Sequence, residues 1–171
     1  MWHYDQTPFA GEFLQLQKPI NSPMPVSEPH PTIIVCGGGE KKTLRFVAKY
    51  ADATNLVVGS PYKLDSFGVL ARKEPDYESW LRAKSGLLQH KLDVLRKHCE
   101  DVGRPYESVY KSVVTYIKVG EDGMAPDEIL RLCNDFAALG FSYVMLVISN
   151  GHELVPLRTI GETVIPSVAG L

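Results

Sequence analysis

Three consecutive glycines are the feature of this 171-residue sequence that most directly suggests binding chemistry. They lie in "TIIVCGGGEKKTLRF", between an apolar run and a segment that starts with two lysines and a threonine. Glycines at such a junction let backbone N–H groups approach an oxyanion closely, and the positive end of a following helix dipole adds attraction. The pattern indicates a phosphate site formed by Gly37, Gly38, Gly39 and Thr43, with Lys41 or Lys42 adding charge.

The glycines also permit a simpler interpretation. The stretch "GGGEKK" matches neither the dinucleotide-binding G-x-G-x-x-G pattern nor the Walker A loop, which needs a longer spacing and a Ser or Thr after its lysine. A tight turn from a strand into a helix, with the lysines in solvent, therefore stays open as the alternative.

A second group of polar residues follows a predicted strand near the C-terminus. Asn150 and His152 lie in "SNGHEL", at the carboxyl end of that strand, where barrel enzymes place functional groups. We expect one of them to face a cofactor or substrate, with Tyr62 as a weaker candidate of the same kind. His90 and His98 lie off the apolar stripe of a predicted helix and are expected at the surface. No nucleophile–base pair and no paired carboxylates stand out, so no catalytic residue is assigned.

The hydrophobic pattern predicts alternating strands and helices around these residues. Strands are expected at 32–36, 53–58, 109–119 and 141–149, and helices at 41–50, 77–102, 126–139 and 154–164, the last stopped by Pro166. The first strand reads as buried on both faces. The order β-α-β-α-β-α-β-α, without a tandem hairpin signal, requires a parallel sheet with right-handed crossovers. Residues 1–31 are rich in proline and predict an extended surface segment.

Two folds are compatible with such a parallel sheet. A doubly wound sheet is complete with four or five strands, whereas a (β/α)₈ barrel needs about 250 residues, and this chain holds four of its eight units. Composition does not choose between them.

Composition limits the classes of partner that the protein is expected to bind. The formal charge of −2 comes from 18 basic and 20 acidic residues without a block of like charge, which disfavours nucleic acid and acidic membranes. The longest apolar runs, such as "YVMLVI", are far shorter than the roughly 20 residues that cross a bilayer, and we expect a soluble, cytoplasmic protein. Cys36, Cys99 and Cys133 lie in apolar contexts that predict reduced core thiols. Without CxxC or HExxH, no metal site is predicted.

Four segments resemble the luciferase-like monooxygenase family of flavin- and deazaflavin-dependent oxidoreductases. They are "MWHYDQTPFAGEFLQL", similar to a helix end and hairpin before the family's fifth strand, "PTIIVCGGGEKKTLRFVAKYADATNL", "KLDVLRKHCEDVGRPYESV" and "IGETVIP". They cover almost the whole chain in the family's order, and the glycine segment is the most specific. Cys36, where a small residue is commoner, and Pro105, where the family has Asp, depart from the pattern.

The resemblance implies a C-terminal half of a (β/α)₈ TIM barrel, because it starts in mid-family and the first four strands are missing. Residues 1–171 would then be a single partial domain, with an N-terminal segment at 1–31 and four βα units at 32–171. Gly37, Gly38, Gly39 and Thr43 would line the phosphate end of the cofactor. By the same resemblance Asn55, Gly59 and Ser60 would approach that phosphate or the ribityl chain.

The resemblance also implies a chemistry. We expect hydride transfer between a reduced cofactor and a small organic substrate, with the deazaflavin coenzyme F-420 favoured over FMN by the wording "GGGEKKTLR" and "ADATN". The alternative is a non-catalytic half-barrel remnant or a partner-dependent subunit. In either case exposed strand edges invite a second copy of the chain or a separate N-terminal half.

Overall fold

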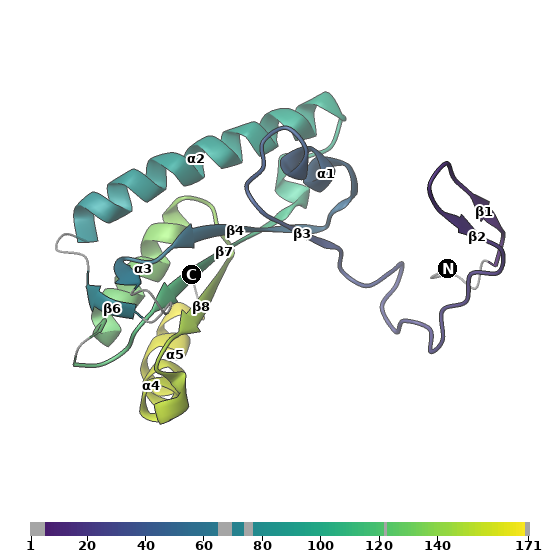
Figure 1. The fold of residues 1–171 in the computed structure, drawn as a ribbon. Coiled ribbons are helices and arrows are strands. Elements are labelled where there is room, and N and C mark those ends of the chain that lie inside the picture. The colour runs from purple at the N-terminus through teal and green to yellow at the C-terminus, as the bar shows by residue number, and fades with distance from the viewer. Residues whose placement is uncertain (1–5, 65–69, 74–76, 122, 170–171) are drawn as a thin grey trace. The chain divides into compact units, whose positions relative to one another are not determined.

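The computed structural model describes residues 6–64, 70–73, 77–121 and 123–169 (Figure 1). The chain divides into two compact units, Met1–Ile33 and Ile34–Leu171. In the first unit, strand β1 (Phe9–Ala10) pairs antiparallel with β2 (Gln15–Leu16). This hairpin confirms the one expected from the resemblance, whereas the helix end at "MW" lies outside the described residues. From Gln17 to Ile33 the backbone forms no helix or strand, as the prolines predict.

The second unit contains a four-stranded sheet whose strands are all parallel, as predicted from the alternation of strands and helices. Its strands follow the order β3 (Ile34–Cys36), β4 (Ala53–Gly59), β7 (Tyr110–Ile117) and β8 (Tyr143–Ile148). Each strand is followed by a helical segment, so the unit consists of four βα repeats.

The helices begin and end close to the predicted positions. They are α1 (Thr43–Tyr50), α2 (Tyr77–Asp101), α3 (Pro126–Ala138) and a terminal helical segment composed of α4 (Val155–Thr159), a π-helical stretch (Ile160–Val164) and α5 (Ile165–Val168). Gly103 and Gly140 follow α2 and α3 with φ of 69° and 92°, the left-handed conformation that ends helices. Pro126 begins α3, and the Glu128 carboxylate accepts a hydrogen bond from the Ala125 N–H.

The core lies on one face of the sheet. Alternate side chains of β4 and β7, among them Leu56, Val58, Val113 and Ile117, are buried in one cluster with residues of all four helical segments. Several side chains of opposite parity, such as Val57 and Tyr116, are exposed. A doubly wound sheet carries helices on both faces. Here the described helices pack on a single face, which a doubly wound sheet would not show.

The first strand corrects a prediction. β3 is shorter than expected and forms an edge of the sheet, and Ile34 and Cys36 are exposed rather than buried on both faces. Cys36 is therefore not a core thiol, whereas Cys99 and Cys133 are buried as predicted. Burial raises the pKa of both of these thiols, which keeps them protonated.

Two further segments differ from the sequence prediction. β5 (Tyr62–Leu64) pairs antiparallel with β6 (Leu70–Lys73), although the sequence contains no hairpin signal. At the C-terminus, Pro166 does not stop the helix but lies within α5. Proline lacks an N–H and clashes with the carbonyl four residues earlier in a regular α-helix. The preceding π-helical stretch, Ile160–Val164, changes that spacing and lets the helix continue.

Candidate functional site

The glycine loop joins β3 to α1, and its first and third residues have structural reasons to be glycine. Gly37 has φ of 114°, a conformation that residues with a side chain rarely adopt, and its N–H donates to the Asn55 carbonyl at 2.9 Å. A Cβ on Gly39 would lie 2.7 Å from the Thr43 hydroxyl oxygen. A Cβ on Gly38 would only make ordinary contact, 3.6 Å from Lys91 Cε. Gly38 is thus the glycine that the local fold does not explain.

The loop presents backbone donors next to a hydroxyl. In the hydrogen bonding of the described residues, the N–H groups of Gly38 and Gly39 donate to no protein group. The Gly39 carbonyl accepts from the Leu44 N–H at 3.0 Å, which turns the chain into α1 and brings Thr43 against Gly39. These two amides, one hydroxyl and the start of a helix form an arrangement suited to an anion.

Helix α2 holds the loop from the side, which sequence reasoning did not foresee. Lys91 Nζ lies 2.5 Å from a carboxylate oxygen of Glu40, and His90 Nε2 lies 3.3 Å from the same oxygen. His98 Nε2 donates to the Glu40 carbonyl at 2.7 Å. The hydrogen bond and charge of Lys91 lower the pKa of Glu40, so its carboxylate stays ionised and fixed to α2. His98 is therefore half-buried, not the simple surface residue that was predicted.

The lysines after the loop are exposed. Lys41 lines a shallow hollow of about 320 Å³ together with Arg45, His98 and Asp101, and Lys42 precedes the first turn of α1. Both carry positive charge beside the loop, and neither forms an ion pair with a carboxylate of the described residues. The hollow is basic on the α1 side, which favours an anionic ligand nearby.

The predicted residues of β4 lie at two different levels. Asn55 pairs in register with Cys36 of β3 and is level with the glycine loop. Its Nδ2 donates to the Met145 sulfur at 3.3 Å, and its Oδ1 is buried without a hydrogen-bond partner. Gly59 is four residues further along, about 13 Å at about 3.3 Å per residue. An isolated phosphate cannot touch both levels, whereas an elongated ligand can.

The level of Gly59, at the carboxyl end of β4, differs from that of Asn55. Gly59 has φ of 83°, and a Cβ there would meet no atom within 4 Å, so the backbone lies open. The Ser60 hydroxyl donates to the Tyr116 carbonyl at 2.8 Å. Tyr62 follows Gly59 and Ser60 in the chain and begins β5. Its side chain lies outside what the structure describes.

Asn150 and His152 have separate roles in the structure. The Asn150 side chain is buried and bonds Val119 in both directions, with Oδ1 accepting from its N–H at 3.1 Å and Nδ2 donating to its carbonyl at 2.9 Å. It lines a hollow of about 340 Å³ at the carboxyl ends of β7 and β8. His152 is exposed, with Nε2 at 4.0 Å from a Glu153 carboxylate oxygen. Of the two, only His152 has a side chain available to a ligand.

Metal binding and membrane spanning are two other functions that the described residues bear on. No three His, Cys, Asp or Glu side chains in the described part gather in a way that would hold a metal ion. None of the described helices is both long enough and apolar enough to cross a membrane.

Comparison with known proteins finds a similarity of fold and no match of sequence. No family model matches the chain, and no curated protein matches it. Among solved structures, the fold is similar to an F420-dependent secondary alcohol dehydrogenase in complex with an F420-acetone adduct, with a TM-score of 0.64 and 13% sequence identity. The match covers 98% of this chain and 57% of that chain. At this identity the similarity concerns the fold, and this chain spans little more than half the length of that neighbour.

Proposed function

We propose that this chain is the C-terminal half of a luciferase-like (β/α)₈ barrel that binds the deazaflavin coenzyme F-420. The observation that carries the proposal is the glycine loop, with two unengaged N–H groups at the carboxyl end of β3, in a fold similar to an F420-dependent enzyme. FMN is the alternative cofactor, because it also carries a phosphate on its ribityl chain. The proposal includes hydride transfer to or from a small organic substrate.

The residues fit the proposed ligand at both levels. Gly38, Gly39 and Thr43 would bind the phosphate through two amides and a hydroxyl, and Lys41 or Lys42 would neutralise part of its charge. The unpartnered Asn55 Oδ1 could accept from a hydroxyl of the ribityl chain, and the open backbone at Gly59 leaves room for the ligand to pass. When bound, a reduced deazaflavin supplies the hydride, so the protein has to bind, orient and exclude water.

A non-catalytic or partner-dependent half-barrel is the second candidate. It is favoured by the exposed side of the sheet opposite the helices, where a barrel would enclose its interior. This candidate shares the ancestry of the first and differs only in activity.

Fluorescence titration with F-420 and with FMN tests the cofactor proposal. We expect saturable binding, tighter for F-420, and an affinity loss of at least about tenfold in Gly38→Val, whose branched side chain would cover the loop amides. Gly38→Ala is the matched control for the added Cβ, because that atom has room. Equal affinities in wild type, Gly38→Ala and Gly38→Val would show that the loop is not part of the binding site.

A further inference from the structure

Strand β8 is an edge of the described sheet that nothing in its sequence protects. It is six residues long, reads "YVMLVI", and has neither a charge nor a proline. Its pairing in the described part is with β7 alone. Edge strands of soluble proteins are usually short, charged or interrupted, because an open apolar edge pairs with other chains. The edge therefore calls for a partner strand.

The sheet face opposite the helices carries no charge, and several of its large side chains are exposed. Ile34, Val57, Tyr116, Tyr143 and Val147 on this face are each 40–64% exposed. The other side chains of the same parity along the four strands, from Cys36 to Met145, are uncharged as well. An identical face can approach it without repulsion between like charges.

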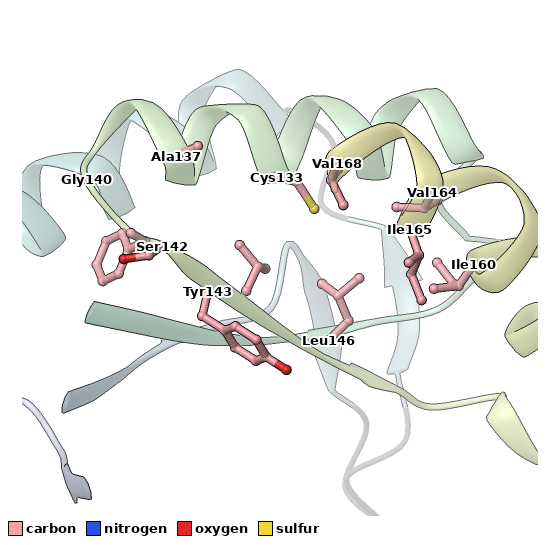
Figure 2. A pocket seen from close by; sticks show the side chains of 12 residues that line it. Cys133, Ala137, Gly140, Ser142, Tyr143, Leu146, Ile160, Val164, Ile165 and Val168 are labelled. Atoms are coloured by element: carbon pink, nitrogen blue, oxygen red, sulfur yellow. The ribbon is translucent and has the colours of Figure 1, made fainter. Parts of the chain in front are cut away.

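An apolar groove lies beside the β8 edge. It has a volume of about 680 Å³ and is lined by α3, β8 and the terminal helical segment. In Figure 2, Cys133 of α3, Leu146 of β8 and Ile165 of α5 surround the space. Because β8 lines the groove and also forms the open edge, a strand added there would bring its own neighbouring helix towards the groove.

The opposite edge of the same sheet carries a projecting aromatic pair. Helix α1 packs against β3, the other edge strand, and exposes Phe46 and Tyr50, at 51% and 63%. Their ring centroids lie 6.2 Å apart, so the two rings form one apolar projection. The chain thus carries an apolar projection at one edge of its sheet and an apolar groove at the other.

We propose that two copies of this chain associate about a two-fold axis, with β8 of each copy beside β3 of the other and Phe46 and Tyr50 of each in the groove of the other. Both contacts are made twice, as two-fold symmetry requires. Four strands from each copy give eight, the number whose barrel interior is filled by side chains. The match covers 57% of the solved neighbour, and in the proposed dimer the second copy takes the place of the rest. The inference rests on the barrel of the proposed function but not on its cofactor.

Sedimentation equilibrium of the purified chain tests this proposal without any cofactor. We expect a species of twice the 19.0 kDa chain mass at micromolar concentration. Phe46→Glu should weaken the dimer at least about tenfold, because it places a charge in an apolar groove. Leu87→Glu is the matched control, since Leu87 is similarly exposed, at 46%, but lies on α2. Near-ultraviolet circular dichroism verifies that each variant is folded.

Hydrogen exchange provides a second readout that needs no variant. The β8 amides should gain protection as the wild-type concentration rises through the dimerisation range, because their free edge becomes paired. A folded wild-type monomer across that range would overturn the proposal, and so would a dimer equally stable in Phe46→Glu and Leu87→Glu. Larger open assemblies would overturn the closed two-fold arrangement. Binding of F-420 by a monomer would overturn the dimer while leaving the cofactor proposal in place.

Discussion

Gly37, Gly38 and Gly39 are adjacent in sequence, yet adding a side chain would have a different consequence at each. Gly37 needs its positive φ, Gly39 has to admit Thr43, and Gly38 has room for a methyl group. A turn alone explains two of the three glycines. The third is explained if a ligand occupies the space in front of the loop, which is why Gly38 is the informative position for mutation.

Glu40 gives a prediction about pH. Its pKa is lowered by the hydrogen bond and charge of Lys91, with a smaller contribution from His90. Because the folded pKa lies below the unfolded one, this stabilising contribution is complete above the unfolded pKa and is lost as pH falls through the folded pKa. Lys91→Met should raise the folded-state pKa of Glu40 towards its ordinary value, so the stabilising contribution becomes smaller and its loss is complete at a higher pH. Carboxyl NMR titration of Glu40 measures the shift.

Lys97→Met is the control for this titration. Lys97 is exposed on the same helix, and removing its charge should leave the Glu40 midpoint where it is in the wild type. Identical midpoints in the Lys91 and Lys97 variants would show that the contact between the loop and α2 does not hold in solution.

At the scale of elements, Asn150 connects the ends of two neighbouring strands. It follows β8 and satisfies both backbone groups of Val119, which follows β7. Asn150→Ala leaves a buried N–H and a buried carbonyl without partners and should lower the free energy of unfolding by about 2–4 kcal/mol. Urea denaturation measures this loss. His152→Ala, next to it in the same segment but exposed, should leave stability within about 0.5 kcal/mol.

The same pair of variants separates structural from ligand-binding roles. If His152 contacts the cofactor, His152→Ala weakens F-420 binding without destabilising the fold. Asn150→Ala with unchanged stability would contradict the role that the structure gives to that side chain.

Local patterns in the sequence predicted most elements, and contacts distant in sequence account for what they missed. The apolar stripe of α2 and the glycine after it fixed that helix and its end, and β4, β7 and β8 followed from apolar runs. β3 was misjudged because an apolar run does not reveal whether anything packs on the second face of the sheet. The continuation past Pro166 depends on a π-helical turn that leaves no mark in the sequence.

The candidate site was predictable to a similar extent. The glycines and Thr43 stand together in the sequence, so their meeting in one loop could be foreseen. Lys91 is 51 residues from Glu40, and no local pattern connects them. Asn150 has the position and chemistry of a ligand-binding residue, and only its two hydrogen bonds to Val119 show that its side chain is engaged.

At the scale of the whole molecule, the fold is similar to part of a larger enzyme, and one side of the sheet is open. Both observations indicate that the proposed site depends on what covers that side. The chain provides a glycine loop and four parallel strands, but a barrel interior needs walls on all sides. Cofactor affinity should therefore depend on what covers the open face, and the assembly and the cofactor site have to be measured on the same sample.

The most direct measurement is an NMR titration of the isotope-labelled full chain with F-420, in which every assigned backbone amide is followed. We predict that the amide resonances of Gly38 and Gly39 shift saturably and further than those of exposed loop residues such as Gly120, because their N–H groups become donors to the phosphate. Unchanged Gly38 and Gly39 resonances in a folded sample, or saturable shifts confined to another part of the chain, would contradict the assignment of this loop as the cofactor site.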